Sequence, residues 1–552
     1  MQASRDWPDP GLVRGSRSCN TDALRRNERR GAWGGLSSMT VKRIPRGLPF
    51  LLVLLVCVPA RGAAVAIRIQ ADEPGPVISR YIYGHFLEHL GRAVYDGVWV
   101  GPDSDIPNRN GLRADVVDAL SALEIPVIRW PGGCYADEYH WRTGIGVPEA
   151  RPVTINMSWG GVEESNAFGT HEFFALVEAL GADAYIAGNL GTGSAQEMVE
   201  WLEYMTSPTN STLAELRRAN GRDEPWQVPF FGVGNESWGC GGQMRPACYA
   251  DLYKQVAEFL GASGQRLVRV ASGGYDARTD WTQTLSQIES NIEGISHHYY
   301  TTPSGIWESK GSATGFGEDE WISTLWRALR VESHIEAQEA VLEVNDPEGN
   351  IGIYLDEWGT WYDPTPGASA LYQQNTLRDA LVAALHFHVF HRHAARVHMA
   401  NIAQTVNVLQ AMILTRGDSM LLTPTYHVFE MYKPFQDATF LPLVFDETPM
   451  YEHADYSVPA VSATAARGAD GRLYASVANL DPAEPAEVTI EVAGAALRNA
   501  SAEILTANAI DGHNTFQAPN AVVPESFDDF ELDGSRLTLR LPAKAIVMIG
   551  FD

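Results

Sequence analysis

The sequence predicts an α/β protein, a (β/α)₈ TIM barrel followed by a smaller all-β sandwich of jelly-roll character. Between about residues 65 and 430, short apolar runs rich in β-branched residues alternate with longer amphipathic stretches. This is the pattern of βα units repeated around a parallel sheet. Eight such runs are present, and eight is the strand number of this barrel. From about residue 431 the helical periodicity stops, and period-two runs alternate with Gly, Pro and Asp turns, as in a sandwich.

Each expected element follows from its own pattern of apolar residues. Short apolar runs predict barrel strands at 81–84, 126–130, 184–188, 230–234, 267–271, 294–298, 351–356 and 399–403. Helical periodicity predicts the connecting helices at 114–123, 171–180, 195–206, 249–260, 281–291, 320–340 and 372–393. Alternation predicts sandwich strands at 473–478, 486–492, 537–541 and 545–549. The stretch 64–71 also alternates, which makes it a candidate for one more strand of the sandwich.

The N-terminal region is expected to lie outside the fold. Residues 1–38 are rich in Arg, Gly and Ser without apolar periodicity, so we interpret them as a non-native extension and Met39 as a better start. Basic residues, the apolar run 48–58 and small residues up to 64 then form the pattern of a secretory signal at 39–64. An uncleaved N-terminal anchor is the alternative, although eleven apolar residues are short for a bilayer. We therefore expect a secreted or periplasmic protein, with the barrel at 65–430 and the sandwich at 431–552.

Composition excludes several kinds of partner. The formal net charge of −27 repels nucleic acid and anionic lipid, and no segment after the signal is long enough to span a membrane. The 15 Trp, 20 Tyr and 19 Phe offer flat faces on which sugar rings can stack, although most aromatic residues of a large domain fill its core. We expect a neutral substrate.

The cysteines are too few for a disulfide scaffold or a zinc site. Without the N-terminal segment, Cys134, Cys240 and Cys248 remain, so at most one intramolecular disulfide forms. Cys240 and Cys248 are neighbours in the sequence, and whether they pair is left open. No metal and no cofactor is expected.

Two carboxylates stand at the ends of predicted strands four and seven. Glu236 follows the apolar run 230–234, and Glu357 follows the run 351–355. Because the carboxyl ends of the strands build the active site of a βα barrel, we expect both side chains at one rim. A glycosidic bond is cleaved by one carboxyl group that protonates the leaving oxygen and a second that attacks the anomeric carbon. A single Glu at a strand end is more often a salt-bridge or capping residue, but two in Trp-rich contexts favour catalysis.

At these residues the chain resembles the α-L-arabinofuranosidases of glycoside hydrolase family 51. The resemblance covers most of the chain from residue 82 to the C-terminal region, and its specific stretches are IYGHFLEHLGR, IRWPGGCYADEYHWRTGIG, FGVGNESWGCGG, ISHHYYT, YLDEWGTWY and RVHMANIAQTVNVLQ. It implies that Glu236 is the acid/base and Glu357 the nucleophile. By the same resemblance, the residues that bind the furanose hydroxyls are Glu88, Cys134, Asn235, Tyr300 and Gln404, with His298 as a supporting pocket residue.

Several of these residues also have a structural interpretation. His298 is equally well explained as a core histidine, Cys134 as a small buried residue beside two glycines, and Arg129 is expected to be structural. Tyr300 is expected to hydrogen-bond Glu357 and orient it. We expect about half of Trp130, Trp238, Trp358 and Trp361 to form stacking walls and the rest to belong to the core. His297 departs from the family, which often has an apolar residue there.

The resemblance implies a retaining exo-glycosidase that hydrolyses terminal non-reducing α-L-arabinofuranosyl residues from arabinose-containing polysaccharides or oligosaccharides. One alternative is an endo-β-glucanase or β-xylosidase on the same scaffold, because fold and carboxylate pair do not fix the sugar. Another is a non-catalytic carbohydrate-binding protein, which need not keep both Glu residues. Members of the family often form hexamers, so a homo-oligomer is compatible with the sequence, but no residue identifies an interface.

Overall fold

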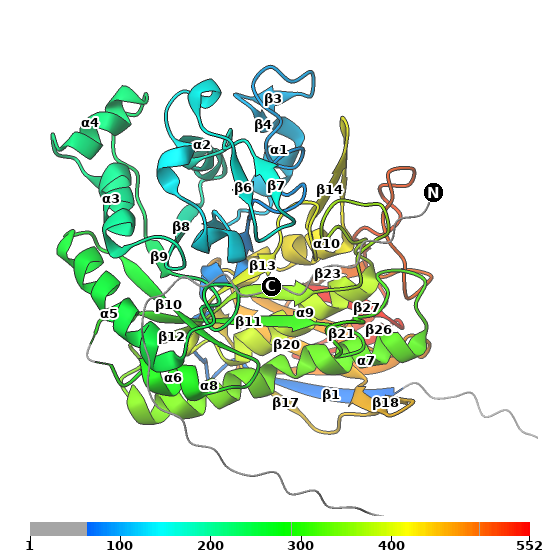
Figure 1. Ribbon diagram of the computed structural model, residues 1–552. Helices are drawn as coiled ribbons and strands as arrows, with labels where there is room; N and C mark the ends of the chain where they lie inside the picture. The colour runs from blue at the N-terminus through cyan, green and yellow to red at the C-terminus, as the bar shows by residue number, and fades with distance from the viewer. Residues whose placement is uncertain (1–62, 289, 496) are drawn as a thin grey trace, which may run out of the picture. The chain divides into compact units, whose positions relative to one another are not determined.

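The structure, a computed structural model, describes residues 63–288, 290–495 and 497–552. The predicted N-terminal extension and residues 39–62 of the predicted signal lie outside these ranges. Within them, eight parallel strands close into a barrel, and a region rich in β-sheet follows it (Figure 1). Both parts of the predicted fold class are confirmed. Around the barrel the strands are β10 (Val268–Tyr275), β11 (Gly294–Thr301), β12 (Gly352–Thr360), β13 (Val397–Ala403), β2 (Gly84–Phe86), β5 (Val127–Trp130), β8 (Asp183–Gly188) and β9 (Phe230–Val233).

Helices alternate with the barrel strands along the chain. They are α1 (Ala114–Ala122), α2 (Thr170–Leu180), α3 (Ala195–Thr206), α4 (Thr212–Ala219), α5 (Pro246–Ala262), α6 (Asp280–Leu285), α7 (Glu318–Leu329), α8 (Val331–Asn345), α9 (Leu377–Arg392) and α10 (Pro424–Met431). The predicted helix at 320–340 is wrong as one element, because the chain divides it at Arg330 into α7 and α8. The predicted helix at 281–291 ends early, at Leu285.

The first barrel strand begins later than predicted. Residues 80–83 form a 3₁₀ turn, η1 (Arg80–Tyr83), whose preceding residue Ser79 accepts a hydrogen bond from the backbone N–H of Tyr81. The strand β2 therefore starts at Gly84. A Cβ at that glycine would lie 2.4 Å from the Asn401 side chain and 2.6 Å from Val127, so glycine is needed where β13 and β5 approach β2.

The sandwich consists of two sheets. One contains β17 (Leu443–Phe445), β1 (Ala63–Gln70), β22 (Ala486–Ala493), β26 (Arg536–Leu541) and β25 (Phe530–Asp533). The other contains β16 (Thr439–Phe440), β20 (Val461–Arg467), β21 (Leu473–Asn479), β27 (Ala545–Phe551), β23 (Ala500–Leu505) and β24 (Glu525–Ser526). The first strand of the described chain, β1, runs parallel to β22 and antiparallel to β17. The first described residues thus contribute to a sheet that otherwise consists of C-terminal strands.

Four two-stranded hairpins project from these two parts. They are β3 (Asn108–Arg109) with β4 (Leu112–Arg113), β6 (Thr154–Asn156) with β7 (Val162–Glu164), β14 (Ile413–Arg416) with β15 (Ser419–Leu422), and β18 (Met450–His453) with β19 (Tyr456–Pro459). Short 3₁₀ turns complete the chain, at η2 (Cys134–Asp137), η3 (Trp141–Gly144), η4 (Pro148–Ala150) and η5 (Lys433–Phe435).

Helix α9 lies between the barrel and the sandwich, and all residues from Leu377 to His391 are buried. Its N-terminus is fixed by a capping box in which the Asp379 carboxylate accepts from the Thr376 backbone. Two of its histidines reach the sandwich, since His388 and His391 contact hydroxyl groups of β20. Burial on all sides explains why α9 lacks a polar face.

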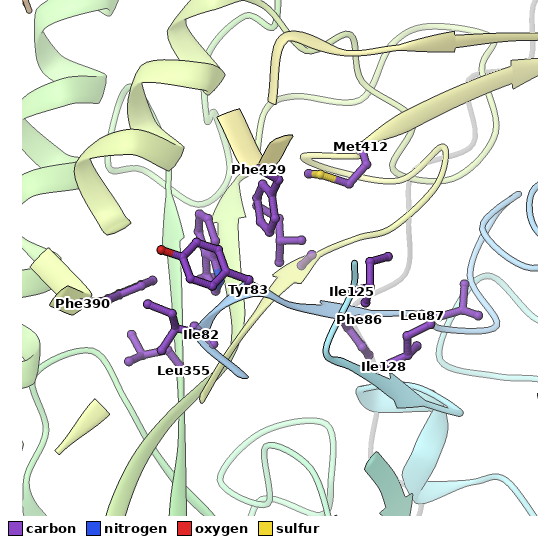
Figure 2. Close-up of a cluster of buried hydrophobic side chains, with 14 of the residues drawn as sticks. Ile82, Tyr83, Phe86, Leu87, Ile125, Ile128, Leu355, Phe390, Met412 and Phe429 are labelled. Carbon is purple, nitrogen blue, oxygen red and sulfur yellow. The ribbon is translucent and has the colours of Figure 1, made fainter. Parts of the chain in front are cut away.

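Apolar side chains fill the space between strands and helices. Figure 2 shows part of this core, with Tyr83, Phe86, Leu355, Phe390 and Phe429 among the labelled residues. A separate cluster of buried side chains comes from the first or third residues of six barrel strands, namely Val127, Tyr185, Phe230, Val270, Tyr354 and Met399. Apolar side chains therefore fill the amino half of the barrel interior.

Candidate active site

The carboxyl ends of the barrel strands place the predicted site residues together. Glu88 follows β2, Asn235 and Glu236 follow β9, and Gln404 follows β13. His298 and Tyr300 lie in the carboxyl half of β11, and Glu357 lies in the carboxyl half of β12. Hydrogen bonds join Glu88 to Gln404, Glu236 to His298, and Glu357 to Tyr300.

The two predicted catalytic carboxylates face each other across His298. One carboxylate oxygen of Glu236, one of Glu357 and a ring nitrogen of His298 all lie within 4.8 Å of one another. Retaining glycosidases hold their two carboxyl groups about 5–5.5 Å apart, and inverting enzymes about 6.5–9.5 Å apart to admit water. The separation fits double displacement.

Glu357 is buried and held on both oxygens. The Arg129 guanidinium donates to Oε1 at 2.8 Å, and the Tyr300 hydroxyl donates to Oε2 at 2.9 Å. The Tyr300 contact is the one expected from the sequence. A Cβ at Gly133 would lie 2.6 Å from Glu357 Oε1, so the second glycine of the PGG stretch is needed for the loop after β5 to pass this carboxylate.

His298 is the cation between the two carboxylates. Its Nδ1 lies 2.8 Å from Glu236 Oε1 and 3.3 Å from Glu357 Oε2, and its Nε2 lies 3.4 Å from Asp356 Oδ1. Burial disfavours the imidazolium, but Glu357, Asp356 and Glu236 together raise the pKa of His298 to about 10. At neutral pH this ring is a charged donor at the centre of the site.

A charged layer lies directly below the site. The Asp356 carboxylate accepts from Tyr185 at 2.7 Å and from Ser296 at 2.5 Å, and it lies 3.6 Å from Arg129. Although burial opposes ionisation, Arg129 and then His298 hold the pKa of Asp356 well below its usual range. Burial also disfavours the charged form of Arg129, yet Asp356 and Glu357 raise its pKa. The expectation that Arg129 is only structural is wrong in one respect, because its guanidinium contacts Glu357 and, at 2.5 Å, Asn235 Oδ1.

Glu88 forms a second acidic position at the rim. Its Oε1 accepts from the backbone N–H groups of Gly133 and Tyr135 and from the Trp159 indole at 2.9 Å. Its Oε2 accepts from Gln404 Nε2 at 3.1 Å. Burial and the nearby Glu357 raise the pKa of Glu88 to about 7 in spite of these donors.

Trp159 was missed by the sequence analysis. It lies in the connection between β6 and β7, a hairpin inserted after the second barrel strand, so no strand-end pattern identifies it. Of the four Trp residues singled out, Trp130 and Trp358 are fully buried and belong to the core, whereas Trp238 and Trp361 are partly exposed. Sugar stacking by Trp238 and Trp361 stays a prediction. His297 is buried against His334 and outside the site.

The disulfide joins different cysteines from those that adjacency suggested. Cys134, after β5, pairs with Cys240, after β9, across 106 residues. Because one sulfur forms one disulfide, this bond rules out a Cys240–Cys248 bridge. The two loops meet only once the barrel has closed, so sequence distance gave no indication of the pairing.

A βα barrel with two carboxylates at this separation, on the fourth and seventh strands along the chain, has the fold and the site of a retaining glycoside hydrolase. The comparisons with known proteins agree. Residues 119–314 match the α-L-arabinofuranosidase 1 domain, and residues 356–545 match the α-L-arabinofuranosidase C-terminal domain. The chain belongs to the α-L-arabinofuranosidases of glycoside hydrolase family 51.

Individual relatives support this assignment. The chain is 47% identical over 490 residues to an intracellular exo-α-L-arabinofuranosidase of Bacteroides ovatus, covering 88% of this chain and 95% of the relative. The crystal structure of a GH51 arabinofuranosidase from Xanthomonas axonopodis pv. citri is 51% identical, with a TM-score of 0.87, and the match covers 89% of this chain and all of that one. An α-L-arabinofuranosidase from Thermotoga maritima in complex with arabinose is 30% identical with a TM-score of 0.79, covering 88% and 99%. The protein is an α-L-arabinofuranosidase.

The prediction of a secreted or periplasmic protein is contradicted. The relative from Bacteroides ovatus is named an intracellular enzyme. The prediction depended on a short basic and apolar pattern, which reports composition and not the route that a protein takes. Among the described residues, no helix is both long and apolar enough to cross a membrane.

Proposed function

We propose that Glu357 is the nucleophile and Glu236 the general acid/base of a double displacement at the anomeric carbon of a terminal, non-reducing α-L-arabinofuranosyl residue. The observation that carries this proposal is the separation of their carboxylates, at most 4.8 Å, with the imidazolium of His298 between them. The substrates are arabinose-containing polysaccharides or oligosaccharides.

The surroundings of the two carboxylates support different roles. Glu357 accepts from the fixed cation Arg129 and from Tyr300, so its negative charge is stabilised before the sugar binds and again when the ester breaks. Glu236 is more exposed, with 19% of its side chain accessible against 8% for Glu357, which suits a group that meets both the leaving group and water. Arg129 and Tyr300 thus favour Glu357 as the anion, and the greater exposure of Glu236 favours it as the proton carrier.

The first step forms the covalent intermediate. One Glu236 oxygen, Oε1, is occupied by the His298 Nδ1–H, so the acidic proton resides on Oε2. That proton passes to the glycosidic oxygen as a Glu357 oxygen bonds to the anomeric carbon and the glycosidic bond breaks. Positive charge on the ring in the transition state is stabilised by Glu357 and by the neighbouring carboxyl of Glu88.

The second step releases arabinose. Glu236, now ionised, removes a proton from water, whose oxygen attacks the anomeric carbon and displaces Glu357. The neutral ester no longer repels the Glu236 carboxylate, which favours this change of role. Two inversions give net retention.

We assign the furanose hydroxyls to the remaining predicted residues. Glu88 accepts from sugar O–H groups, and the side-chain amides of Asn235 and Gln404 both donate and accept. Tyr300 and His298 orient the two carboxylates. Cys134, as half of a disulfide, offers a contact surface and a weak acceptor in place of a thiol donor.

A panel of p-nitrophenyl glycosides tests the sugar, the anomer and the mode of attack. We expect release from the α-L-arabinofuranoside and not from β-xyloside or β-glucoside, with α-arabinose as the first product in the ¹H NMR spectrum. Arabino-oligosaccharides should lose single terminal residues. Release of internal oligosaccharides, or of β-arabinose first, would contradict the proposal.

A further inference from the structure

The acid/base residue has an unfavourable backbone conformation. Glu236 has φ = +39°, in the left-handed region that residues other than glycine rarely adopt, and it follows Gly234 at φ = +78°. Such conformations persist only where the surroundings hold them firmly. Two contacts, called ties below, hold the segment that contains Glu236.

The first tie is the buried carboxylate of Asp137. Its Oδ2 accepts from the backbone N–H of Asn235 at 2.9 Å, and its Oδ1 accepts from Leu190 and Gly191 at 2.8 and 2.9 Å. These donors belong to the loops after β9 and β8, whereas Asp137 itself lies in the loop after β5. One side chain, 4% exposed, thus joins three loops of the active site.

The second tie is the disulfide between Cys134 and Cys240. Cys240 Sγ lies 3.6 Å from Glu236 Oε2, the oxygen assigned above to the acidic proton. The turn η2 begins at Cys134 and ends at Asp137, so the two ties lie at its two ends. In the segment after β9, the two ties hold Asn235 and Cys240, which lie on either side of Glu236.

The held segment is also closed on itself. The backbone N–H groups of Gly239 and Gly241 donate to the Glu236 carbonyl at 2.6 and 3.2 Å. A Cβ at Gly241 would lie 1.9 Å from the Asn235 carbonyl oxygen and 2.5 Å from Asp137 Oδ2. The segment packs directly on the first tie, with no space for it to shift.

We propose that Asp137 and the Cys134–Cys240 disulfide are positioning elements for proton transfer, and that both are needed to hold Glu236 against its backbone preference. This inference rests on the proposed acid/base role of Glu236. It follows that a reductant which opens the disulfide weakens the proton-transfer steps. Cys240 is exposed and Cys134 is partly exposed, so solvent reaches the bond.

The reduction itself is balanced by a water-soluble trialkylphosphine. The phosphorus lone pair attacks one sulfur and breaks the S–S bond, so the phosphine gives up two electrons and the two sulfur atoms take them up. Water then supplies the oxygen of the phosphine oxide, and its two protons convert the two sulfurs to thiols. No other residue of the enzyme is changed, so a change in its kinetics is due to the loss of the disulfide.

The first arm of the test is Asp137→Asn, compared on substrates with good and poor leaving groups. Since a misplacement of about 1 Å can cost on the order of 10²-fold, we expect kcat/KM to fall by that order on arabino-oligosaccharides. On 2,4-dinitrophenyl α-L-arabinofuranoside, whose leaving group needs no proton, it should stay nearly unchanged. Azide should raise kcat on this activated substrate, because it attacks the intermediate without a general base.

The matched control is Asp346→Asn. Asp346 is also a buried carboxylate that accepts from backbone N–H groups, those of Asn350 and Ile351, but it precedes β12 at the opposite end of the barrel. We expect it to lower stability without changing the leaving-group dependence or the azide response. A merely structural role of Asp137 would give the same result as this control.

The second arm uses the folded wild-type protein treated with the phosphine, and in parallel the variant Cys240→Ser, which removes the disulfide and keeps the Cys134 side chain. Both should show the same selective loss on poor leaving groups and the same gain with azide, also on the order of 10²-fold or less. This arm stands even when Asp137→Asn does not fold. Equal losses on both substrate types in either arm would overturn the inference.

Glu236→Ala, measured alongside, distinguishes a failure of the positioning role from a failure of the acid/base role. A selective loss in Glu236→Ala without one in the two arms rejects the positioning role alone. Absence of a selective loss in Glu236→Ala rejects the acid/base assignment itself.

Discussion

The two ends of the barrel interior differ sharply although the same strands build both. Along β5 the inward side chains are Val127 and then Arg129, and along β12 they are Tyr354 and then Asp356. The amino half is an apolar cluster, whereas the carboxyl half buries charged groups in mutual contact. Two residues further along each strand, the inward side chain is charged where the previous one packs in the apolar cluster.

This difference shows how the molecule separates stability from function. A fully buried apolar side chain contributes about 1.5–3 kcal/mol to stability, so the amino half stabilises the barrel. Buried charges cost free energy unless they are paired or hydrogen-bonded. Here Arg129 pairs with Asp356 and Glu357, whereas Glu88 and Asp137 accept hydrogen bonds from N–H groups. The charged groups of the carboxyl half therefore serve function and not stability. Substitutions in the amino half should change the free energy of unfolding, and substitutions in the carboxyl half should change the kinetics.

The largest expected effect is that of Glu357→Ala on turnover. Loss of a covalent nucleophile should lower kcat by on the order of 10⁶-fold, and azide should restore part of the activity by replacing the missing carboxylate. The control is Glu293→Ala, which removes a Glu that pairs with Arg269 just before β11, at the other end of the barrel. Normal turnover by Glu357→Ala would contradict the assignment, as would an equal loss in the control.

Glu236→Ala should have a smaller and selective effect. Its kcat/KM on unactivated substrates should fall about 10²–10⁴-fold, the usual contribution of general acid catalysis. Activated aryl arabinofuranosides should retain most of their kcat/KM. A series of aryl leaving groups measures this selectivity, and a uniform loss across the series would argue against acid catalysis.

Two substitutions on β13 compare the ends of the barrel directly. Met399→Ala removes a fully buried side chain of the apolar cluster and should lower the free energy of unfolding by about 2–5 kcal/mol, with kcat of the folded protein unchanged. Gln404→Ala, just beyond the same strand, should raise KM because it removes a proposed contact to the sugar and the hydrogen bond to Glu88. Urea unfolding and steady-state kinetics on both variants are the measurements. A larger kinetic effect from Met399→Ala than from Gln404→Ala would refute the division.

The smallest expected effect is a change in how the free energy of unfolding depends on pH, and it concerns His386 in helix α9. Burial lowers the pKa of His386 to about 3, so the folded state stays neutral there while the unfolded state takes up a proton below about pH 6.5. The free energy of unfolding should then decrease as pH falls from 6.5 toward 4. His298, with its pKa raised to about 10, acts in the opposite sense and loses its contribution only as pH rises above 6.5.

Urea titrations between pH 7 and 4 measure this slope. His386→Phe removes one buried titrating group and should reduce the slope by about 1 kcal/mol per pH unit, whereas kinetics at pH 7 should not change. An identical slope in the variant would show that His386 does not contribute to acid sensitivity.

Local patterns predicted the architecture and the two carboxylates that face each other at one rim, because both depend on periodicity and on position along a strand. Eight short apolar runs were enough to indicate the barrel, and Glu236 and Glu357 were recognised as strand-end residues. The division between α7 and α8 at Arg330 was missed because the amphipathic pattern continues across it. The start of β2 was misplaced because η1 has the same apolar composition as a strand.

Features that depend on contact between distant loops were less predictable. The Cys134–Cys240 bond joins loops from different βα units, and Asp137 acts on the Asn235 backbone across 98 residues. Arg129 was taken for a structural residue because a basic residue inside a strand usually serves an ion pair. It does form one with Asp356, but the same guanidinium also holds Glu357.

The configuration of the sugar azide formed by the two glutamate variants tests the central claim most directly. In Glu357→Ala, azide must displace the leaving group itself, so ¹H NMR should show β-L-arabinofuranosyl azide, the inverted product. In Glu236→Ala, Glu357 still forms the ester and azide displaces it, so the product should be the α anomer. The opposite pair of configurations, or the same anomer from both variants, would contradict the assignment of nucleophile and acid/base.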